Sequence, residues 1–222
     1  MSNLDARADF QAQRAEKLAA FLHDLLQLRG DERVLDVGAG LGAFAFAVAP
    51  RAREVVAVEQ DETAVARARE VAPPNVEFVV GDGEALEFDP FSFDVAATVR
   101  TLHHTRRPEL LVAELVRVTR PSGTILVADQ LAPIDPMAAL ELNAFERARD
   151  PSTTRVMPDG DLRALFDANN LVLRRAEVVR EARDIESYLD LAGLSEGPAR
   201  DRARSLAPTG YEAVTGWYVL ER

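Results

Sequence analysis

The 222-residue sequence predicts an α/β fold, in which a doubly wound, mostly parallel sheet carries helices on both faces. Two observations lead to this fold class. Short apolar runs rich in valine alternate with stretches that have the three- and four-residue spacing of amphipathic helices. A turn with three glycines follows the first of these runs and opens the next helix. Strands that alternate with helices pair in parallel through right-handed crossovers, so we expect one sheet in a single domain.

The first two thirds of the chain supply the parallel part of the sheet. Residues 6–28 place Leu18, Leu22 and Leu25 on one side of an amphipathic helix, which ends at Gly30. The expected strands are Val34–Val37, Val55–Val58, Val76–Val80, Val95–Val99 and Thr124–Ala128. The expected helices between them are Ala43–Ala49, Glu62–Val71 and Pro108–Thr119. This alternation predicts helices that cross over from strand to strand.

The last third of the chain has a different order of elements. Helices are expected at Pro136–Arg149, Asp159–Asn169 and Ile185–Ala192, and strands at Leu171–Val179 and Val214–Leu220. Acidic residues in the first turn support the helix that starts at Asp159, and Asn169-Asn170 suits a left-handed stop. No internal repeat or long linker is visible, so we expect residues 1–222 to form one domain.

The composition argues against several classes of function. The net charge of −11 repels polyanions, so nucleic acids are not expected as partners. The absence of cysteine excludes disulfides and Cys-type metal sites, and three histidines are too few for a multi-histidine metal centre. The longest apolar run, Ala43–Ala49, is too short for a bilayer, and the first residues lack a signal-peptide pattern. We therefore expect a cytoplasmic protein without a membrane partner or a metal; no oligomeric state is indicated.

The glycine turn lies in the stretch VLDVGAGLGAFAFAVA, where Gly38, Gly40 and Gly42 connect a strand to a helix. Without side chains, these positions permit left-handed dihedrals and let a ligand lie against the backbone near helix N-terminal amides. This pattern is typical of a nucleotide-type cofactor, although it also fits the relaxed dinucleotide fingerprint. Asp36 would repel a pyrophosphate but attract a ligand that carries an ammonium and a sulfonium. S-adenosylmethionine is such a ligand; a tight structural turn is the alternative.

Two further acidic positions follow the next two strands. Glu59 ends the second strand, where a carboxylate can accept both ribose hydroxyls of either a nicotinamide cofactor or S-adenosylmethionine. Asp82 follows the third strand and could accept the adenine amino group, while Gly83 offers a backbone amide to the ring. Asp-Gly is also a common turn former. The carboxyl ends of parallel strands are where open α/β sheets bind ligands, so we expect Asp36, Glu59 and Asp82 to share one site.

These residues belong to a longer resemblance. From Asp31 to Pro133 the sequence resembles the class I S-adenosylmethionine-dependent methyltransferases, and within them the small bacterial type (methyltransferase type 11) similar to ubiquinone/menaquinone C-methyltransferases. The similar segments are VLDVGAGLG, VVAVEQ, VEFVVGDGEALEFDPFSFDVAATV, LHH and ELVRVTRPSGTILVADQLAP, in this order. The resemblance implies a Rossmann-like, seven-stranded sheet whose last strand is antiparallel. It also implies S-adenosylmethionine as cofactor and S-adenosylhomocysteine as product.

The resemblance implies a role for each of these positions. Asp36 and the three glycines would hold the methionine end of the cofactor, together with the backbone near Val99. Glu59 would bind ribose, and Gln60, Asp82 and Gly83 would lie at the adenine. Where the family loop often reads Pro-Gly-Gly, this chain has Pro121-Ser122-Gly123, which we still expect to turn.

The methyl acceptor is less well defined by the sequence. Methyl transfer from a sulfonium mainly requires the acceptor to be held in line, so a catalytic side chain is optional. His104, after the fourth strand, is a weak candidate for a general base, with helix packing as the alternative. His103 is its neighbour, and only one of two adjacent helical residues is expected to face the site. Further acceptor-side candidates are Arg100, Arg106, Arg107 and the pair Asp129-Gln130; solvated surface is the alternative for the arginines.

Within the single domain we expect a helical lid (1–30), a cofactor-binding core (31–132), a substrate-side helical insert (133–170) and C-terminal strands (171–222). In the insert, NAFERARDPSTTR looks like a segment of a bacterial subgroup in which a histidine commonly follows Asp-Pro-Ser. Thr153 stands there in this chain, so no role of that histidine carries over. The predicted function is methyl transfer to a small molecule. A nicotinamide-dependent oxidoreductase and a noncatalytic S-adenosyl-ligand-binding module are the alternatives.

Overall fold

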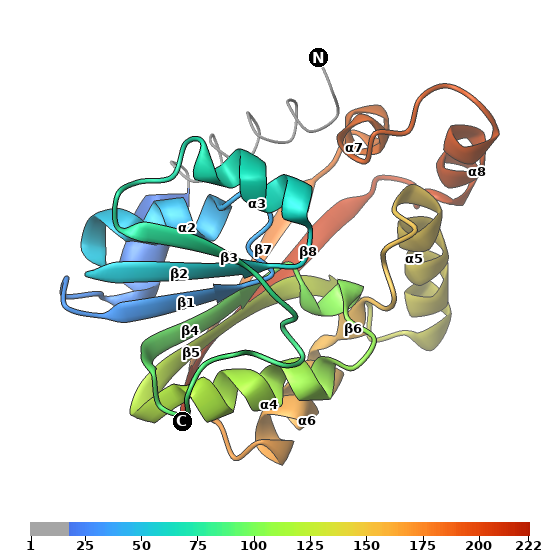
Figure 1. Cartoon of the computed structure of the whole chain (residues 1–222). Helices are drawn as coiled ribbons and strands as arrows, with labels where there is room; N and C mark the ends of the chain where they lie inside the picture. Colours follow the sequence, from blue (N-terminus) through green and yellow to red (C-terminus); the bar gives the residue numbers. More distant parts are fainter. Residues whose placement is uncertain (1–17) are drawn as a thin grey trace.

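The computed structural model describes residues 18–222 and has one twisted sheet with helices on both faces (Figure 1). The strand order is β3-β2-β1-β4-β5-β8-β7, and a further two-residue strand, β6, pairs with β5 outside this path. The strands are β1 (Arg33–Val37), β2 (Glu54–Glu59), β3 (Val76–Val80), β4 (Phe93–Val99), β5 (Thr119–Ala132), β6 (Met157–Pro158), β7 (Val172–Ala182) and β8 (Glu212–Glu221). The expected doubly wound architecture is confirmed.

The direction of the strands also agrees with the expectation. β1 to β5 are parallel, with registers such as Val34 opposite Val55 in β2 and opposite Val95 in β4. The last strand, β8, runs antiparallel to both β5 and β7. The expected antiparallel last strand is therefore confirmed; its position between β5 and β7, and the short strand β6, are features that the sequence did not indicate.

Helices cover the two faces of the sheet and one of its ends. They are α2 (Ala43–Val48), α3 (Glu62–Arg69), α4 (Pro108–Val118), α5 (Pro136–Arg149), α6 (Asp159–Ala168), α7 (Ile185–Leu191) and α8 (Pro198–Leu206); η1 (Ala49–Arg51) and η2 (Leu102–His104) are 3₁₀ turns. α4 and α6 pack on one face, and α2, α3 and the helix over residues 18–26 pack on the other. α5, α7 and α8 gather at one end of the sheet (Figure 1).

Valines and alanines build the two halves of the core because both faces of the central strands are covered. In β1, Leu35 and Val37 face α4, while Val34 belongs to the cluster around α2 and α3. The described part of the first helix contributes Leu22 and Leu25 to the second cluster. Residues 6–17 of that expected helix lie outside the described residues. From residue 18 onward, every helix is too short or too polar to span a membrane.

The differences from the expected elements lie mainly in the last third. α8 was not expected because its sequence, PARDRARSL, is polar apart from two alanines and one leucine. It packs against α5, and its Arg200 is buried by ion pairs with Glu186 and Asp190. β5 begins earlier than expected because Thr119 already pairs with Phe93 of β4, before an irregularity in the register; within this stretch Ser122 makes the expected turn, at φ +60°. Asn170 takes the left-handed stop predicted for it, at φ +56°.

Candidate functional site

A cavity of about 770 Å³ opens at the carboxyl ends of the parallel strands, between the sheet and the α5–α7 end of the molecule. This is the edge at which open α/β sheets bind ligands. The predicted site residues that line it are Asp36, Gly38, Gly40, Glu59, Gln60, Asp82, Gly83, Val99 and His104. One predicted residue, Gly42, is not in the cavity wall. The strand ends therefore bring together nearly all the side chains expected there.

Backbone geometry explains the glycines. Gly38 has φ +75°, and a Cβ at this position would lie 2.2 Å from the Thr101 methyl group, so a side chain is excluded. Gly40 has φ +55° and open space around it. Gly42 (φ +90°) is the N-cap of α2 and packs against the rings of Phe46 and Phe78 instead of the cavity. Gly42 thus shapes the turn from behind, while the other two leave room beside the backbone.

Glu59 connects the end of β2 to the glycine loop. One of its carboxylate oxygens accepts the backbone N–H of Gly40 at 2.8 Å, and the other accepts the N–H of Asp61 at 3.0 Å. Each carboxylate oxygen can accept a second hydrogen bond, so the group can hold the loop and still accept hydroxyl donors from the cavity. The side chain is partly exposed to the cavity.

Asp36 has the most unusual environment in the cavity wall. Asp36 is 1% exposed, and its Oδ2 atom has no hydrogen-bond partner among the described residues. Burial raises the pKa of Asp36 to about 7; the Ala45 backbone N–H opposes this shift and the charge of Glu59 adds to it. A buried acceptor without a partner costs about 1–3 kcal/mol, which a cationic hydrogen-bond donor in the cavity would offset.

The residues expected near an adenine lie together beyond β2 and β3. Asp82 is exposed, and its carboxylate accepts the backbone N–H of Glu84 at 2.8 Å, so it does form the turn that Asp-Gly favours. Gly83 has no room for a side chain, since a Cβ would lie 2.6 Å from a Val37 methyl group. Gln60 is exposed at the rim. The turn function of Asp82 is compatible with a free carboxylate oxygen toward the cavity.

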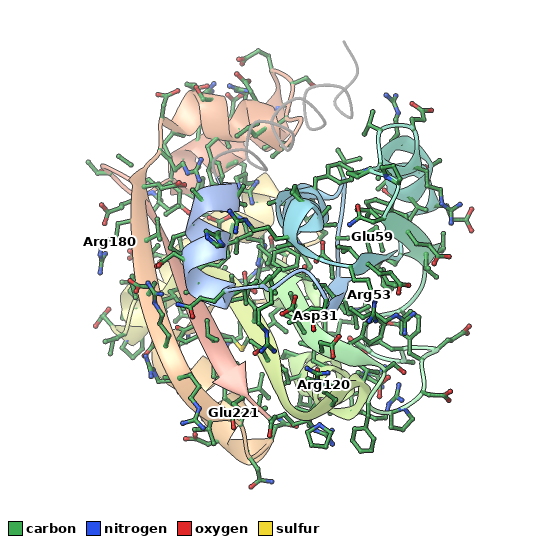
Figure 2. All side chains as sticks on the ribbon, turned by 90° about the vertical axis from the view of Figure 1, so that its left-hand side faces the viewer. Asp31, Arg53, Glu59, Arg120, Arg180 and Glu221 are labelled. Atoms are coloured by element: carbon green, nitrogen blue, oxygen red, sulfur yellow. The ribbon has the colours of Figure 1, made fainter. Side chains whose placement is uncertain are left out.

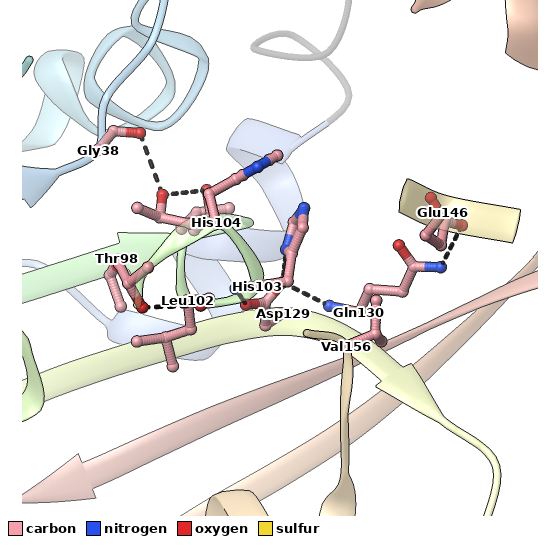
Figure 3. A network of polar contacts seen from close by, with 12 residues as sticks. Gly38, Thr98, Leu102, His103, His104, Asp129, Gln130, Glu146 and Val156 are labelled. Carbon is pink, nitrogen blue, oxygen red and sulfur yellow. Dashed lines mark hydrogen bonds and ion pairs between the residues drawn. The ribbon is translucent and has the colours of Figure 1, made fainter. Parts of the chain in front are cut away.

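His103 is held by Asp129 beneath the cavity wall (Figure 3). The Nδ1 atom lies 2.5 Å from one Asp129 oxygen, and the other oxygen accepts the His103 backbone N–H at 2.8 Å. Burial acts to raise the pKa of Asp129, but the His103 ring and N–H donors hold it below its usual value. An ionised Asp129 accepts the Nδ1–H of His103 and so fixes the orientation of the ring.

His104 stacks against His103, with the two ring centres 4.0 Å apart. Both residues line the cavity, although His103 is only 4% exposed, so the expectation that only one of them faces the site does not hold. The reason is local: residues 102–104 form a 3₁₀ turn instead of an α-helix. Burial and the neighbouring His103 lower the pKa of His104 to about 4, so this imidazole is neutral at pH 7.

A serine connects His104 to a carboxylate. The Ser152 Oγ atom lies 2.9 Å from His104 Nδ1 and donates to Asp150 Oδ1 at 2.6 Å. A hydroxyl has one proton, so when it is given to Asp150 the oxygen is left to accept the His104 Nδ1–H. The segment RARDPS, which the sequence assigned to the acceptor side, therefore reaches the same cavity as the glycine loop.

The far wall of the cavity rests on a buried polar network around Glu146 of α5. Glu146 is 1% exposed and accepts hydrogen bonds from Tyr211 at 2.6 Å, Gln130 at 2.8 Å and Arg149 at 2.9 Å. Burial acts to raise the pKa of Glu146, but Arg149 and the two other donors lower it overall. Figure 3 shows Gln130 extending from β5 to Glu146. Asp129 and Gln130 thus act behind the wall and do not line it.

The arginines expected on the acceptor side separate into two groups. Arg100 and Arg106 line the cavity. Arg107 instead forms an ion pair with Glu84 at 2.8 Å on the surface. Arg149 also lines the cavity, with Asp150 and Pro151; the sequence indicates these three residues as part of the acceptor pocket, with a helix end before a proline as the alternative. Arg183, which the sequence did not indicate, completes this side.

A second, smaller cavity of about 340 Å³ lies at the amino ends of the strands. Its charged groups include Asp31, Arg53 and Arg120, which are labelled in Figure 2. Arg120 pairs with Asp94, and Asp94 also accepts the backbone N–H of Arg33 at 2.6 Å. This cavity lies at the edge opposite the glycine loop, and its Arg120 and Asp94 pair with each other, so we assign the functional site to the larger cavity. Within residues 18–222, no three His, Cys, Asp or Glu side chains are grouped as a metal site requires.

Comparison with known proteins identifies the family. Residues 35–127 match the family model described as a methyltransferase domain. YcgJ of Bacillus subtilis, an uncharacterized methyltransferase, is 36% identical over 168 residues, which are 71% of this chain and 66% of that protein. The chain therefore carries a methyltransferase domain over residues 35–127. The demethylmenaquinone methyltransferase of Clavibacter sepedonicus is 32% identical over 57% of the chain and 52% of that enzyme.

Solved structures share the fold of this methyltransferase over nearly its whole length. The crystal structure of YcgJ has a TM-score of 0.79 and 24% identity, and covers 93% of this chain and 97% of that one. A Bacillus halodurans protein with a provisional methyltransferase assignment has a TM-score of 0.84 and 24% identity, with 91% and 97% covered. In sequence, the match spans 66% of YcgJ and about half of the Clavibacter enzyme. The family and the fold are therefore established.

Proposed function

We propose that this chain transfers a methyl group from S-adenosylmethionine to a small-molecule acceptor. The observation that carries the proposal is the buried Asp36 carboxylate, whose Oδ2 has no partner among the described residues, beside a glycine loop held by Glu59. A ligand with an ammonium and a sulfonium would supply the missing positive charge and donor. A pyrophosphate, as in a nicotinamide cofactor, would face repulsion from the same carboxylate.

The cavity residues fit the remaining parts of this cofactor. Glu59 has free lone pairs for two ribose hydroxyls, and Asp82 with the Gly83 amide would bind adenine, with Gln60 beside it. Asp36, Gly38, Gly40 and the backbone at Val99 would hold the methionine end. S-adenosylmethionine supplies an activated methyl group on a sulfonium. The protein then contributes mainly by orientation, which can supply about 7–11 kcal/mol.

A base is required when the acceptor is a hydroxyl or an acidic carbon. His104 suits this role because it is neutral at pH 7, and the Ser152 contact leaves its Nε2 atom free to take the proton. His103 is the second candidate, since Asp129 fixes its Nδ1–H. A positioned base contributes on the order of 10²–10⁴-fold in rate. The acidic chain, with a net charge of −11, supports a small molecule over a nucleic acid as acceptor.

Isothermal titration with S-adenosylhomocysteine and NADH tests the cofactor assignment. We expect saturable binding of S-adenosylhomocysteine and none of NADH. Glu59→Ala should weaken binding by about 30- to 100-fold, because it removes both the ribose acceptor and the anchor of the Gly40 amide. Glu62→Ala, at an exposed position of α3, is the matched control and should bind as the wild type. NADH binding without S-adenosylhomocysteine binding would favour the oxidoreductase alternative.

A further inference from the structure

The walls of the cavity carry opposite charges at its two ends. Near the glycine loop the lining acids are Asp36, Glu59, Asp61, Asp82 and Glu84. From α5 onward the lining residues include Arg149 and Arg183, with Asp150 as the acid among them. Arg100 and Arg106 also line the cavity, but Arg106 adjoins Arg107, which pairs with Glu84 of the acidic end. The end away from the cofactor residues is therefore the basic end.

Arg149 is held in place instead of being free in solvent. Its side chain is 9% exposed, and Nε donates to Glu146 at 2.9 Å. The guanidinium carbon lies 4.2 Å from the centre of the Tyr188 ring, which stacks in turn against Tyr211. Within the described residues, the two terminal nitrogens of Arg149 make no hydrogen bond. Ordering such a long side chain costs conformational entropy, and here the contacts with Glu146 and Tyr188 offset that cost. The terminal nitrogens of Arg149 are thus held in place without a partner and can donate to a ligand.

Arg183 reaches the same ring from the end of β7. Its guanidinium carbon lies 5.8 Å from the Tyr188 centre, and one terminal nitrogen contacts Glu181. The Nε–H is buried and has no acceptor among the described residues. A buried donor without an acceptor is unfavourable and is rare in folded proteins.

We propose that the methyl acceptor carries a carboxylate, which binds Arg149 and Arg183 beside Tyr188 at the basic end of the cavity. A planar carboxylate matches the geometry of a guanidinium and can accept from the free Arg149 nitrogens and from the Arg183 guanidinium, both of which belong to residues that line the cavity. The anchored acceptor would extend from this end toward His104, which lines the same cavity. That the bound carboxylate belongs to a methyl acceptor rests on the proposed function. Carboxylate binding itself can be tested without methyl transfer.

The test measures carboxylate binding by NMR of the arginine side chains. The ¹⁵N-labelled full chain, saturated with S-adenosylhomocysteine, is titrated with benzoate and hexanoate, and separately with benzamide and hexanamide. The Nε–H resonances of Arg149 and Arg183 are assigned from the variants below. We expect a saturable shift of both resonances with at least one carboxylate and no shift with its amide.

Variants separate a binding role from a structural one. Arg183→Met should lower the affinity for the carboxylate by about tenfold, which is the loss expected for one charged hydrogen bond. Arg180→Met is the matched control. Arg180 is an exposed residue of β7 (Figure 2), three positions before Arg183, and pairs with Glu212, so this variant should change nothing. Arg149→Met alone would leave Glu146 buried without its cation, so the double variant Glu146→Gln/Arg149→Met is used and should also lose binding.

Three results would overturn the proposal. They are the absence of a shift with both carboxylates, equal binding of the amides, and wild-type affinity in Arg183→Met together with the double variant. Failure of the proposed function looks different. In that case S-adenosylhomocysteine does not bind, and the carboxylate titration of the unliganded chain still decides whether the anion site exists.

Discussion

Asp36 and Glu59 end adjacent strands, yet the fold treats their carboxylates differently. Both oxygens of Glu59 accept backbone N–H groups, so this side chain holds the glycine loop even without a ligand. Asp36 is buried, and one of its oxygens has no partner in the described structure. Glu59 is therefore preorganised, whereas the buried Asp36 carboxylate is unfavourable until a cation binds beside it. This contrast predicts that the two respond differently to pH.

Cofactor binding should depend on the protonation of Asp36. In the free protein burial raises its pKa to about 7, and a bound cation would lower that pKa, so binding releases a proton. Affinity for S-adenosylmethionine should therefore rise by about tenfold per pH unit below pH 7 and level off above it. Titration calorimetry from pH 5.5 to 7.5, in buffers of different ionisation enthalpy, measures both the affinity and the released proton. In Asp36→Asn, the pH dependence should disappear along with most of the affinity.

The serine contact of His104 should determine which ring nitrogen carries the proton. Because Ser152 donates to Asp150, the wild type should hold His104 as the Nδ1–H tautomer. ¹⁵N NMR of the imidazole at pH 7 measures this directly. Ser152→Ala should lower the Nδ1–H fraction, whereas Ser205→Ala, on the exposed face of α8, should not alter it. A wild-type His104 protonated on Nε2 would contradict the base assignment.

At the level of elements, the turn before the main run of β5 carries backbone strain. Ser122 lies at φ +60°, where a side chain is unfavourable by roughly 1 kcal/mol, and Gly123 leaves no room for a Cβ. Ser122→Gly should stabilise the protein by about 0.5 kcal/mol, since glycine relieves the strain but gains freedom in the unfolded chain. Ser205→Gly in α8 should instead destabilise by about 0.5–1 kcal/mol. Urea denaturation compares the two, and a loss of stability in Ser122→Gly would argue against the strain.

The sequence predicts the central strands well because local pattern and burial agree there. Valine-rich runs bounded by glycine, proline or acids coincide with β1 to β4, and α5 was predicted to the residue. α8 escaped prediction because its packing depends on buried ion pairs of Arg200, which no periodicity of apolar residues signals. β6 has two residues and depends on a tertiary contact with β5.

The sequence likewise predicts one part of the candidate site, the cofactor side, better than the acceptor side. Asp36, Glu59 and Asp82 could be found because parallel strands bring their carboxyl ends to one edge. The acceptor side could not, because its parts come from distant segments: the Asp129 carboxylate under His103, and Tyr211 with Gln130 on Glu146. Local signals named single candidates on this side, such as His104, Asp129-Gln130 and the segment RARDPS, but not the contacts that join them. Tertiary packing, and not the type of residue, makes these side chains functional candidates.

On the scale of the whole molecule, a ligand that bridges the sheet edge should stabilise the fold. Binding at a concentration of 100 Kd adds about 2.7 kcal/mol, which raises Tm by roughly 5–10 °C for a chain of this length. Differential scanning calorimetry with S-adenosylhomocysteine measures this shift. At the same ligand concentration, Glu59→Ala should lose most of the shift, and Glu62→Ala should keep it.

The central claim is that the large cavity binds S-adenosylmethionine, with its amino acid end at Asp36 and its ribose at Glu59. A crystal structure of the complex with S-adenosylhomocysteine tests it most directly. The account predicts a ligand ammonium within hydrogen-bonding distance of Asp36 Oδ2 and ribose hydroxyls on the Glu59 carboxylate. A ligand bound elsewhere, or one that leaves Asp36 without a partner, would contradict the account.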